Sequence, residues 1–127
     1  MKQSIKKLPD GEFQLMKALW HMTGPATAPR LTEQLAATLP SRGWRPQTVA
    51  SMLLRLEKKG FLRSEKPGRE RVYFPQISEQ TYLEYEARDF SLRFSNASVS
   101  GLIKALYDGR ALSEKDIDEL RDWISRK

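Results

Sequence analysis

The 127-residue sequence has no cysteine, a single histidine and no long apolar run. Without cysteine the chain can form neither a disulfide nor a thiolate metal site, which is typical of a cytosolic protein. No apolar stretch approaches the roughly 18 residues that a membrane span needs. The basic residues 1–7 are not followed by the apolar run of a signal peptide. We therefore expect a cytoplasmic protein that is not inserted in a membrane.

The sequence also has few features that are typical of an enzyme active site. The single histidine, His21, stands near the end of an apolar-periodic segment, a setting typical of a surface or half-packed side chain. No glycine-rich phosphate loop is present. A metal site usually draws its ligands from several segments, whereas one acidic cluster lies on a single predicted helix: Asp116, Asp118, Glu119 and Asp122. We expect no enzymatic activity, no catalytic residue, no bound metal and no cofactor.

The net charge of +6 is unevenly distributed. Residues 1–75 hold 14 Lys and Arg against 6 Asp and Glu, whereas residues 76–127 hold 8 against 10. A basic module suits a polyanion, and nucleic acid is the commonest one, although a basic surface that is merely solvated has the same composition. We place a domain boundary here, with a nucleic-acid-binding domain in residues 1–75 and a second domain in residues 76–127.

Apolar periodicity predicts three helices in the first part. The first begins near Asp10, whose side chain could cap it, and ends before Gly24-Pro25. The second has Thr27 as its N-cap and Pro29 in its first turn, and Pro40 stops it. The third spans about residues 46–59 and ends at Gly60, as helices often do at glycine.

After Gly60 the pattern changes to that of two short strands, in residues 61–65 and 70–75, around a Pro67-Gly68 turn. This arrangement predicts a β-hairpin. Three helices followed by a basic hairpin is the element order of a winged helix-turn-helix. We therefore predict a mainly α fold with a small β-hairpin wing.

The predicted helix of residues 46–59 has one apolar face and one face whose first turns carry small or short polar side chains. Such a face allows the backbone to approach base edges in the major groove. We predict base contacts from Gln47, Thr48, Ala50 and Ser51. We predict phosphate contacts from Arg42, Arg45 and Arg55, and from the wing residues Lys66, Arg69 and Arg71.

Several of these residues have alternative interpretations. Thr48 could cap the helix instead, and Arg55 could pair with Glu33 or Glu57 and not reach DNA. The wing arginines could be merely solvated. Leu54 lies in the middle of the polar face, and the sequence leaves open whether it packs inward or meets DNA.

The second part contains three more predicted helices, at about residues 78–94, 99–108 and 113–124. Each is apolar on one side, and a single copy could hardly bury all three faces, whereas a homodimer would. A two-fold dimer would present two recognition helices to a palindrome. In the alternative, these helices fold back on the first domain. We predict dimerisation through Leu102, Ile103, Leu106, Ile117, Leu120, Trp123 and Ile124.

Four stretches of the chain resemble the penicillinase-repressor family of bacterial transcription regulators: "LPDGEFQLMKALW" (8–20), "GWRPQTVASMLLRLEKKGFL" (43–62), "RVYFP" (71–75) and "ALSEKDIDELRDWI" (111–124). The family includes the β-lactamase, methicillin-resistance and copper-transport repressors. The resemblance implies a winged-helix domain, a helical dimerisation domain and repression through double-stranded operator DNA. It also implies an operator dyad built on TACA/TGTA half-sites.

The chain departs from that family pattern at informative positions. Ala50 and Leu54 stand where members often carry a basic residue and a threonine, which affects the operator sequence. The absence of cysteine excludes the copper-binding motif of the copper-responsive members. Antibiotic-responsive members are cut at an Asn-Phe bond between the fourth and fifth helices. The joint here offers Asn96-Ala97, a candidate regulatory cleavage site for a membrane sensor-protease partner.

Two other functions fit the same elements. A nonspecific DNA-packaging or architectural protein would bind DNA with steep salt dependence but little sequence preference. A winged helix used for protein contacts would show neither salt-dependent DNA binding nor a preference for a DNA sequence.

Overall fold

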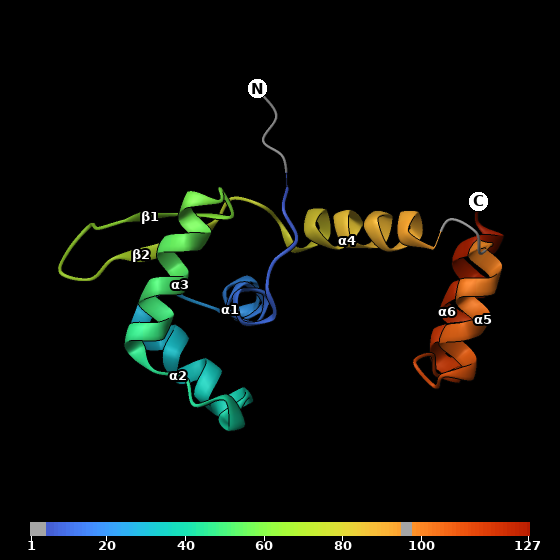
Figure 1. The fold of residues 1–127 in the computed structure, drawn as a ribbon, viewed down its shortest axis with the longest axis horizontal. Helices are drawn as coiled ribbons and strands as arrows, with labels where there is room; N and C mark the ends of the chain where they lie inside the picture. The colour runs from blue at the N-terminus through green and yellow to red at the C-terminus, as the bar shows by residue number, and fades with distance from the viewer. Residues whose placement is uncertain (1–4, 95–97) are drawn as a thin grey trace. The chain divides into compact units, whose positions relative to one another are not determined.

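The computed structural model describes residues 5–94 and 98–127. They fall into two compact units, one that ends at Glu86 and a second of Ala87–Lys127 (Figure 1). In chain order the described elements are α1 (Asp10–His21), α2 (Ala28–Thr38), the 3-10 turn η1 (Pro40–Arg42), α3 (Pro46–Lys58), β1 (Leu62–Glu65), β2 (Val72–Pro75), α4 (Glu79–Arg93), α5 (Val99–Asp108) and α6 (Glu114–Ser125). The predicted fold class, mainly α with a two-stranded hairpin, is confirmed.

Most of the helix ends follow from local capping. The Thr27 hydroxyl accepts a hydrogen bond from the Arg30 amide at 3.3 Å, as predicted for the start of α2. Ser113 and Asp116 form a reciprocal capping box at the start of α6. The predicted cap at Asp10 is wrong, because α1 begins at Asp10 itself, with Pro9 at the N-cap position and no side-chain cap. The Asp10 carboxylate instead accepts a hydrogen bond from Arg42 at 2.8 Å.

The first unit contains all the fully buried hydrophobic side chains of the described residues. Three helices contribute to this core through one face each, and the first residues after Gly60 add to it. The buried hydrophobic residues are Leu8, Leu15, Met16, Leu19, Ala26, Leu31, Leu35, Val49, Met52, Leu53, Leu56, Phe61, Leu62 and Tyr82. The core therefore closes around α1, α2 and α3 and leaves the opposite face of α3 free.

Tyr82 of α4 belongs to this core although it lies beyond residue 75, where we placed the domain boundary. Its ring packs against Phe13, Trp20, Phe61 and Tyr85, with ring centroids 5.6 to 6.0 Å away. Its hydroxyl accepts a hydrogen bond from the backbone N–H of Leu8 at 2.8 Å. The first turns of α4 therefore complete the first unit.

The hairpin pairs antiparallel, with Leu62 opposite Pro75 and Glu65 opposite Val72. It is also attached to the loop between α1 and α2. Thr27 forms an isolated β-bridge with Val72, and the Tyr73 amide donates to the Ala26 carbonyl at 2.9 Å. The wing is therefore fixed at its base, and Figure 1 shows its far end extending beyond α3.

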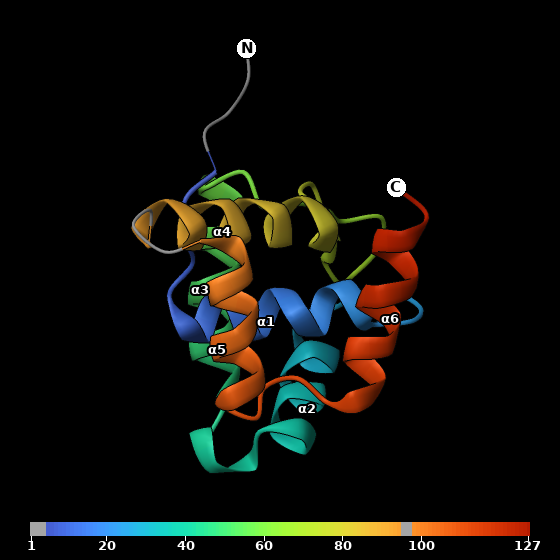
Figure 2. The same cartoon turned by 90° about the vertical axis from the view of Figure 1, so that its right-hand side faces the viewer.

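The second unit has a different character. Its helices α5 and α6 run in opposite directions and are joined by a loop (Figure 2). Among its described residues none is fully buried. Large apolar side chains on its helices and just after α4 are 44 to 67% exposed, including Phe90, Leu92, Phe94, Val99, Leu106, Tyr107, Trp123 and Ile124. In one copy this unit therefore lacks a closed core.

Candidate nucleic-acid interface

Helix α3 is held in place by its apolar face. Val49, Met52, Leu53 and Leu56 are all at most 5% exposed, and they recur at helical spacing. Burying four such side chains contributes several kcal/mol to folding, at about 1.5–3 kcal/mol each. The opposite face of α3 is consequently fixed in direction and presented to solvent.

The four predicted base-contacting residues share this outward face. Gln47, Thr48, Ala50 and Ser51 are all exposed, within the first two turns of α3. Capping by Thr48 is wrong, because the N-cap residue is Arg45 and the helix has no side-chain cap. The structure thus brings together a surface of one amide, two hydroxyls and one methyl group.

Leu54 also points outward, with 63% of its surface exposed, so the inward alternative is wrong. It lines a hollow of about 510 Å³ between α3 and the wing, together with Ala50, Lys58, Ser64 and Tyr73 among others. The sequence left Leu54 undecided, because helical spacing alone does not tell an exposed leucine from a boundary one. In the structure, Leu54 contributes an apolar side chain to the lining of the hollow between α3 and the wing.

Side-chain hydrogen bonds connect the wing to the end of α3. Arg71 Nη1 donates to Ser64 Oγ at 3.1 Å, and Ser64 Oγ donates to the Glu57 carboxylate at 3.1 Å. Tyr73 lies beside them, and burial raises the pKa of its hydroxyl, against the opposing effect of Arg71. The hydroxyl is therefore protonated at neutral pH. This connection fixes the spacing between α3 and the strands.

The predicted cationic residues lie around this surface. Lys66 and Arg69 are exposed in the turn between the strands, and Arg45 is exposed at the start of α3. Arg42 in η1 pairs with Asp10, and its guanidinium lies 5.5 Å from the centre of the Trp44 ring. The charge of Arg42 is therefore partly neutralised by Asp10.

Arg55 has a partner that the sequence did not suggest. Its Nε donates to Glu12 Oε2 at 3.1 Å, and Lys59 Nζ donates to the other oxygen of Glu12 at 2.5 Å. The alternatives of Glu33 and Glu57 are wrong. Glu12 is 5% exposed, whereas the Arg55 side chain is 53% exposed. This carboxylate therefore ties α1 to two successive turns of α3 and leaves part of Arg55 accessible.

The remaining predicted sites lie elsewhere. His21 is exposed and its ring nitrogen lies 3.0 Å from Glu79 Oε2. The predicted dimerisation residues lie on α5 and α6, where they are half-exposed or exposed: Leu102, Ile103, Leu106, Ile117, Leu120, Trp123 and Ile124. The candidate cleavage site Asn96-Ala97 lies outside the described residues and stays a prediction.

Comparison with known proteins places the chain in a family. A family profile described as "Penicillinase repressor" matches residues 8–126. The chain belongs to the penicillinase repressor family. The resemblance inferred from the four sequence stretches is thereby confirmed. This is a family of transcriptional repressors and not of enzymes, which also confirms the expectation that the chain is not an enzyme.

Named members of the penicillinase repressor family are similar over nearly the whole chain. The penicillinase repressor of Bacillus licheniformis is 34% identical over 119 residues, covering 91% of this chain and 90% of that protein. The methicillin resistance regulatory protein MecI of Staphylococcus aureus (strain N315) is 23% identical over 127 residues, covering all of both chains.

Solved structures of the family match the first unit. The solution structure of the DNA binding domain of the repressor BlaI has a TM-score of 0.52 and 36% identity, covering 64% of this chain and 94% of that one. The Bacillus licheniformis BlaI monomeric form in complex with the blaP half-operator gives a TM-score of 0.51, with the same identity and coverage. None of the helices in the described ranges of this chain combines the length and apolar composition needed to cross a membrane.

Proposed function

We propose that this chain represses transcription by binding a palindromic operator as a homodimer, with α3 in the major groove and the β1–β2 hairpin as a wing. One observation carries the proposal: the outward face of α3 is small and polar and lies beside a basic hairpin. A relative of the same fold, 36% identical, has been solved on a half-operator. Such a repressor acts on the chromosome, and we accordingly place it in the cytoplasm.

The chemistry of the α3 surface suits base reading. The Gln47 amide can donate and accept, and is suited to adenine N6 and N7. The Thr48 and Ser51 hydroxyls can bond to several base edges, and the Ala50 methyl group can contact a thymine methyl. All four side chains are exposed and within two turns of the helix start. They therefore supply specificity in this proposal.

The cationic residues supply affinity. Arg42 and Arg45 precede α3, Arg55 lies on it, and Lys66, Arg69 and Arg71 belong to the wing region. Charge contacts to phosphate position a protein on DNA without reading its sequence, and each one adds to the salt dependence of binding. Arg55 and Arg71 are oriented by Glu12 and Ser64 before DNA arrives, so they lose less side-chain freedom on binding.

The second unit supports the dimer. None of the described residues of this unit is buried and many of its apolar side chains are exposed, and a second copy related by a two-fold axis would cover them. The resulting dimer would carry two copies of α3, as a palindromic operator requires. In this proposal residues 76–127 serve dimerisation, apart from the first turns of α4 that complete the first unit.

The test is a titration of the purified chain against two duplexes, one with a TACA/TGTA dyad and one scrambled, at two salt concentrations. Specific binding should exceed nonspecific binding by roughly a thousandfold or more, with two chains per dyad. Equal, steeply salt-sensitive binding to both duplexes would contradict specificity for this dyad, and selection from random DNA would then tell a diverged operator from an architectural protein. Absence of DNA binding would contradict the whole proposal.

A further inference from the structure

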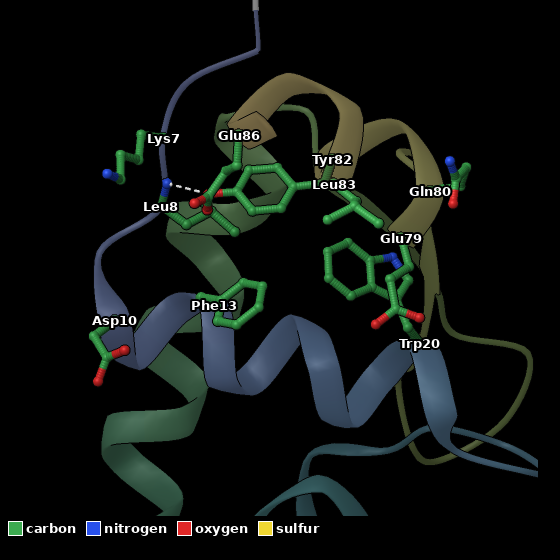
Figure 3. Close-up of a pocket in the computed structure, with 10 residues that line it drawn as sticks. All are labelled: Lys7, Leu8, Asp10, Phe13, Trp20, Glu79, Gln80, Tyr82, Leu83 and Glu86. Carbon is green, nitrogen blue, oxygen red and sulfur yellow. Dashed lines mark hydrogen bonds between the residues drawn. The ribbon is translucent and has the colours of Figure 1, made fainter. Parts of the chain in front are cut away.

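A hollow of about 650 Å³ lies in the first unit, between α1, the segment before it and the first turns of α4 (Figure 3). No residue of α3 or of the wing lines it, so it is separate from the candidate DNA interface. Its wall contains the rings of Phe13, Trp20 and Tyr82, whose centroids lie 5.8, 6.0 and 6.4 Å apart. The hollow therefore has an aromatic wall.

The polar atoms of this wall already have partners. The Tyr82 hydroxyl accepts from the Leu8 amide at 2.8 Å, the dashed line in Figure 3. Trp20 Nε1 donates to the Ile77 carbonyl at 2.9 Å. Leu83 adds an apolar side chain that is 58% exposed. Tyr82 is 2% exposed and belongs to the core, whereas Phe13 and Trp20 are half-buried. The accessible wall thus consists of the Phe13 and Trp20 rings and the Leu83 methyl groups, which suit an apolar or aromatic ligand.

The charged residues around the hollow are mostly acidic. Three carboxylates, those of Asp10, Glu79 and Glu86, face one cation, Lys7. Asp10 is already paired with Arg42. Glu79 Oε2 lies 3.0 Å from His21 Nε2. Among residues 5–94 and 98–127, neither Glu79 nor Glu86 forms an ion pair with a lysine or arginine. Residues 1–86 hold 14 Lys and Arg against 9 Asp and Glu, so this negative site lies in a unit that is basic as a whole.

We propose that this hollow binds a lipophilic organic cation, meaning a positively charged centre carried on aromatic groups. The ring faces would attract the cation through their quadrupoles, and Glu79 and Glu86 would complement its charge. A nucleic acid or any other polyanion would be repelled by the same carboxylates. The proposal concerns a ligand site outside the DNA interface, so it stands or falls independently of operator binding.

Two probes of the same shape and opposite charge test the proposal: tetraphenylphosphonium and tetraphenylborate. Equilibrium dialysis with the full chain gives the affinity for each. Nonspecific adsorption to a protein of net charge +6 would favour the borate anion. The site instead requires that tetraphenylphosphonium bind about tenfold more tightly or better, one cation per chain, with an affinity that falls as salt rises.

The carboxylates are tested by the double variant Glu79→Gln/Glu86→Gln. It should lower the affinity for tetraphenylphosphonium about tenfold and leave tetraphenylborate unaffected or bound more tightly. The matched control is Glu33→Gln/Glu84→Gln, which changes the charge equally at exposed positions that do not line the hollow. The control should bind tetraphenylphosphonium as the unaltered chain does. Circular dichroism checks that both variants are folded.

The position of the ligand is tested by fluorescence. In a Trp44→Phe/Trp123→Phe variant the emission comes from Trp20 alone, and it should change on addition of tetraphenylphosphonium with the affinity measured by dialysis. The proposal is overturned if the anion binds as tightly as the cation, or if the double glutamine variant binds the cation unchanged. Cation binding that occurs only after dilution to monomers would assign the hollow to a second copy of this chain and would also overturn it.

Discussion

Leu54 is the one large apolar side chain on the outward face of α3, and it is 63% exposed. Its neighbours in the hollow between α3 and the wing include Ala50 and Tyr73. A leucine that stays exposed in the free protein gains burial free energy only when a partner covers it. In the proposed complex the partner is the major groove, where thymine methyl groups are the apolar features.

The first prediction is therefore that Leu54 reads thymine methyl groups. Replacing operator thymines with deoxyuridine removes each methyl group, and at one position this should weaken binding about fourfold, corresponding to roughly 0.8 kcal/mol. In Leu54→Ala the same replacement should have no effect, because the methyl group then has no partner. Gel-shift titrations of the two proteins with the two duplexes form a double-mutant cycle. A deoxyuridine effect of equal size in both proteins would contradict the assignment.

Glu12 is a second residue whose side chain has a particular role because of where it lies. It is the one acidic side chain among the described buried residues, and it bonds Arg55 and Lys59. Its charge is compensated, but removing it would leave two cations that can turn toward solvent, since Arg55 and Lys59 are 53 and 27% exposed. The loss should therefore be smaller than for a fully buried pair.

We predict that Glu12→Gln lowers the free energy of unfolding by about 1–3 kcal/mol. Urea denaturation followed by circular dichroism measures this change. Glu33→Gln, which removes an exposed carboxylate from α2, is the control and should change stability by less than about 0.5 kcal/mol. Equal stability of the two variants would show that the Glu12 pairs contribute nothing.

At the scale of elements, we propose that α3 and the wing have different roles in DNA recognition. Base edges are read by α3, whereas the exposed cations of the wing contact phosphate in the proposed complex. The two roles respond differently to DNA sequence and to salt. A substitution in each element can therefore tell them apart.

We predict that Gln47→Ala reduces the preference for operator over scrambled DNA, at a cost of about 1–3 kcal/mol on the operator alone. Arg69→Ala should weaken binding to both duplexes about equally and reduce the salt slope by about one. Arg126→Ala, an equal charge change in the second unit, is the control. The reverse pattern in titrations at several salt concentrations would exchange the roles of the two elements.

The elements themselves could be predicted because their signals are local. Apolar spacing, Thr27, Ser113 and Gly60 fix most helix ends within a residue or two, and the change of period after Gly60 locates the hairpin. Long-range partners could not be predicted. The attachment of the wing to Ala26 and Thr27, and of Arg55 to Glu12, joins residues far apart in the chain. No local pattern encodes which of several carboxylates meets a given arginine.

The candidate site shows the same limit. The outward positions of Gln47 and Ser51 follow from helical period alone, and the structure places both on the exposed face. The core role of Tyr82 was missed, because α4 has apolar residues on more than one side and a weak stripe. Composition placed the boundary at residue 75, where the basic charge ends, whereas packing continues to Glu86. The end of the basic segment and the end of the packed unit therefore fall at different residues.

At the scale of the whole molecule, α4 takes part in two units. Its first turns place Tyr82 in the core of the first unit, and its last residues belong to the second. Losing a buried aromatic side chain costs about 3–5 kcal/mol, which is comparable to the total stability of a small domain.

We predict that a fragment of residues 1–75 is largely unfolded, whereas a fragment of residues 1–90 folds and binds a half-site. Thermal unfolding monitored by circular dichroism distinguishes the two. Tyr82→Ala in the longer fragment should reproduce the instability of the shorter one. Cooperative unfolding of residues 1–75 with the stability of residues 1–90 would place the boundary back at residue 75.

The second unit should decide the oligomeric state. We predict that Ile124→Asp, at a side chain that is 57% exposed in one copy, produces monomers that bind the operator poorly while remaining folded. Ser125→Asp adds the same charge at the neighbouring exposed position and should remain dimeric. Sedimentation at several concentrations measures the mass. An Ile124→Asp variant that stays dimeric would move the interface to other residues.

The place of Tyr82 also affects how the protein is made. A ribosome adds about 5–20 residues per second. A chain synthesised only to the end of the wing still lacks Tyr82, against whose ring Phe13, Trp20 and Phe61 pack. The first unit therefore cannot complete its core during synthesis until α4 has emerged. By then much of the remaining chain has been translated, so a newly made molecule completes the core around α3 and acquires helices α5 and α6 at nearly the same time.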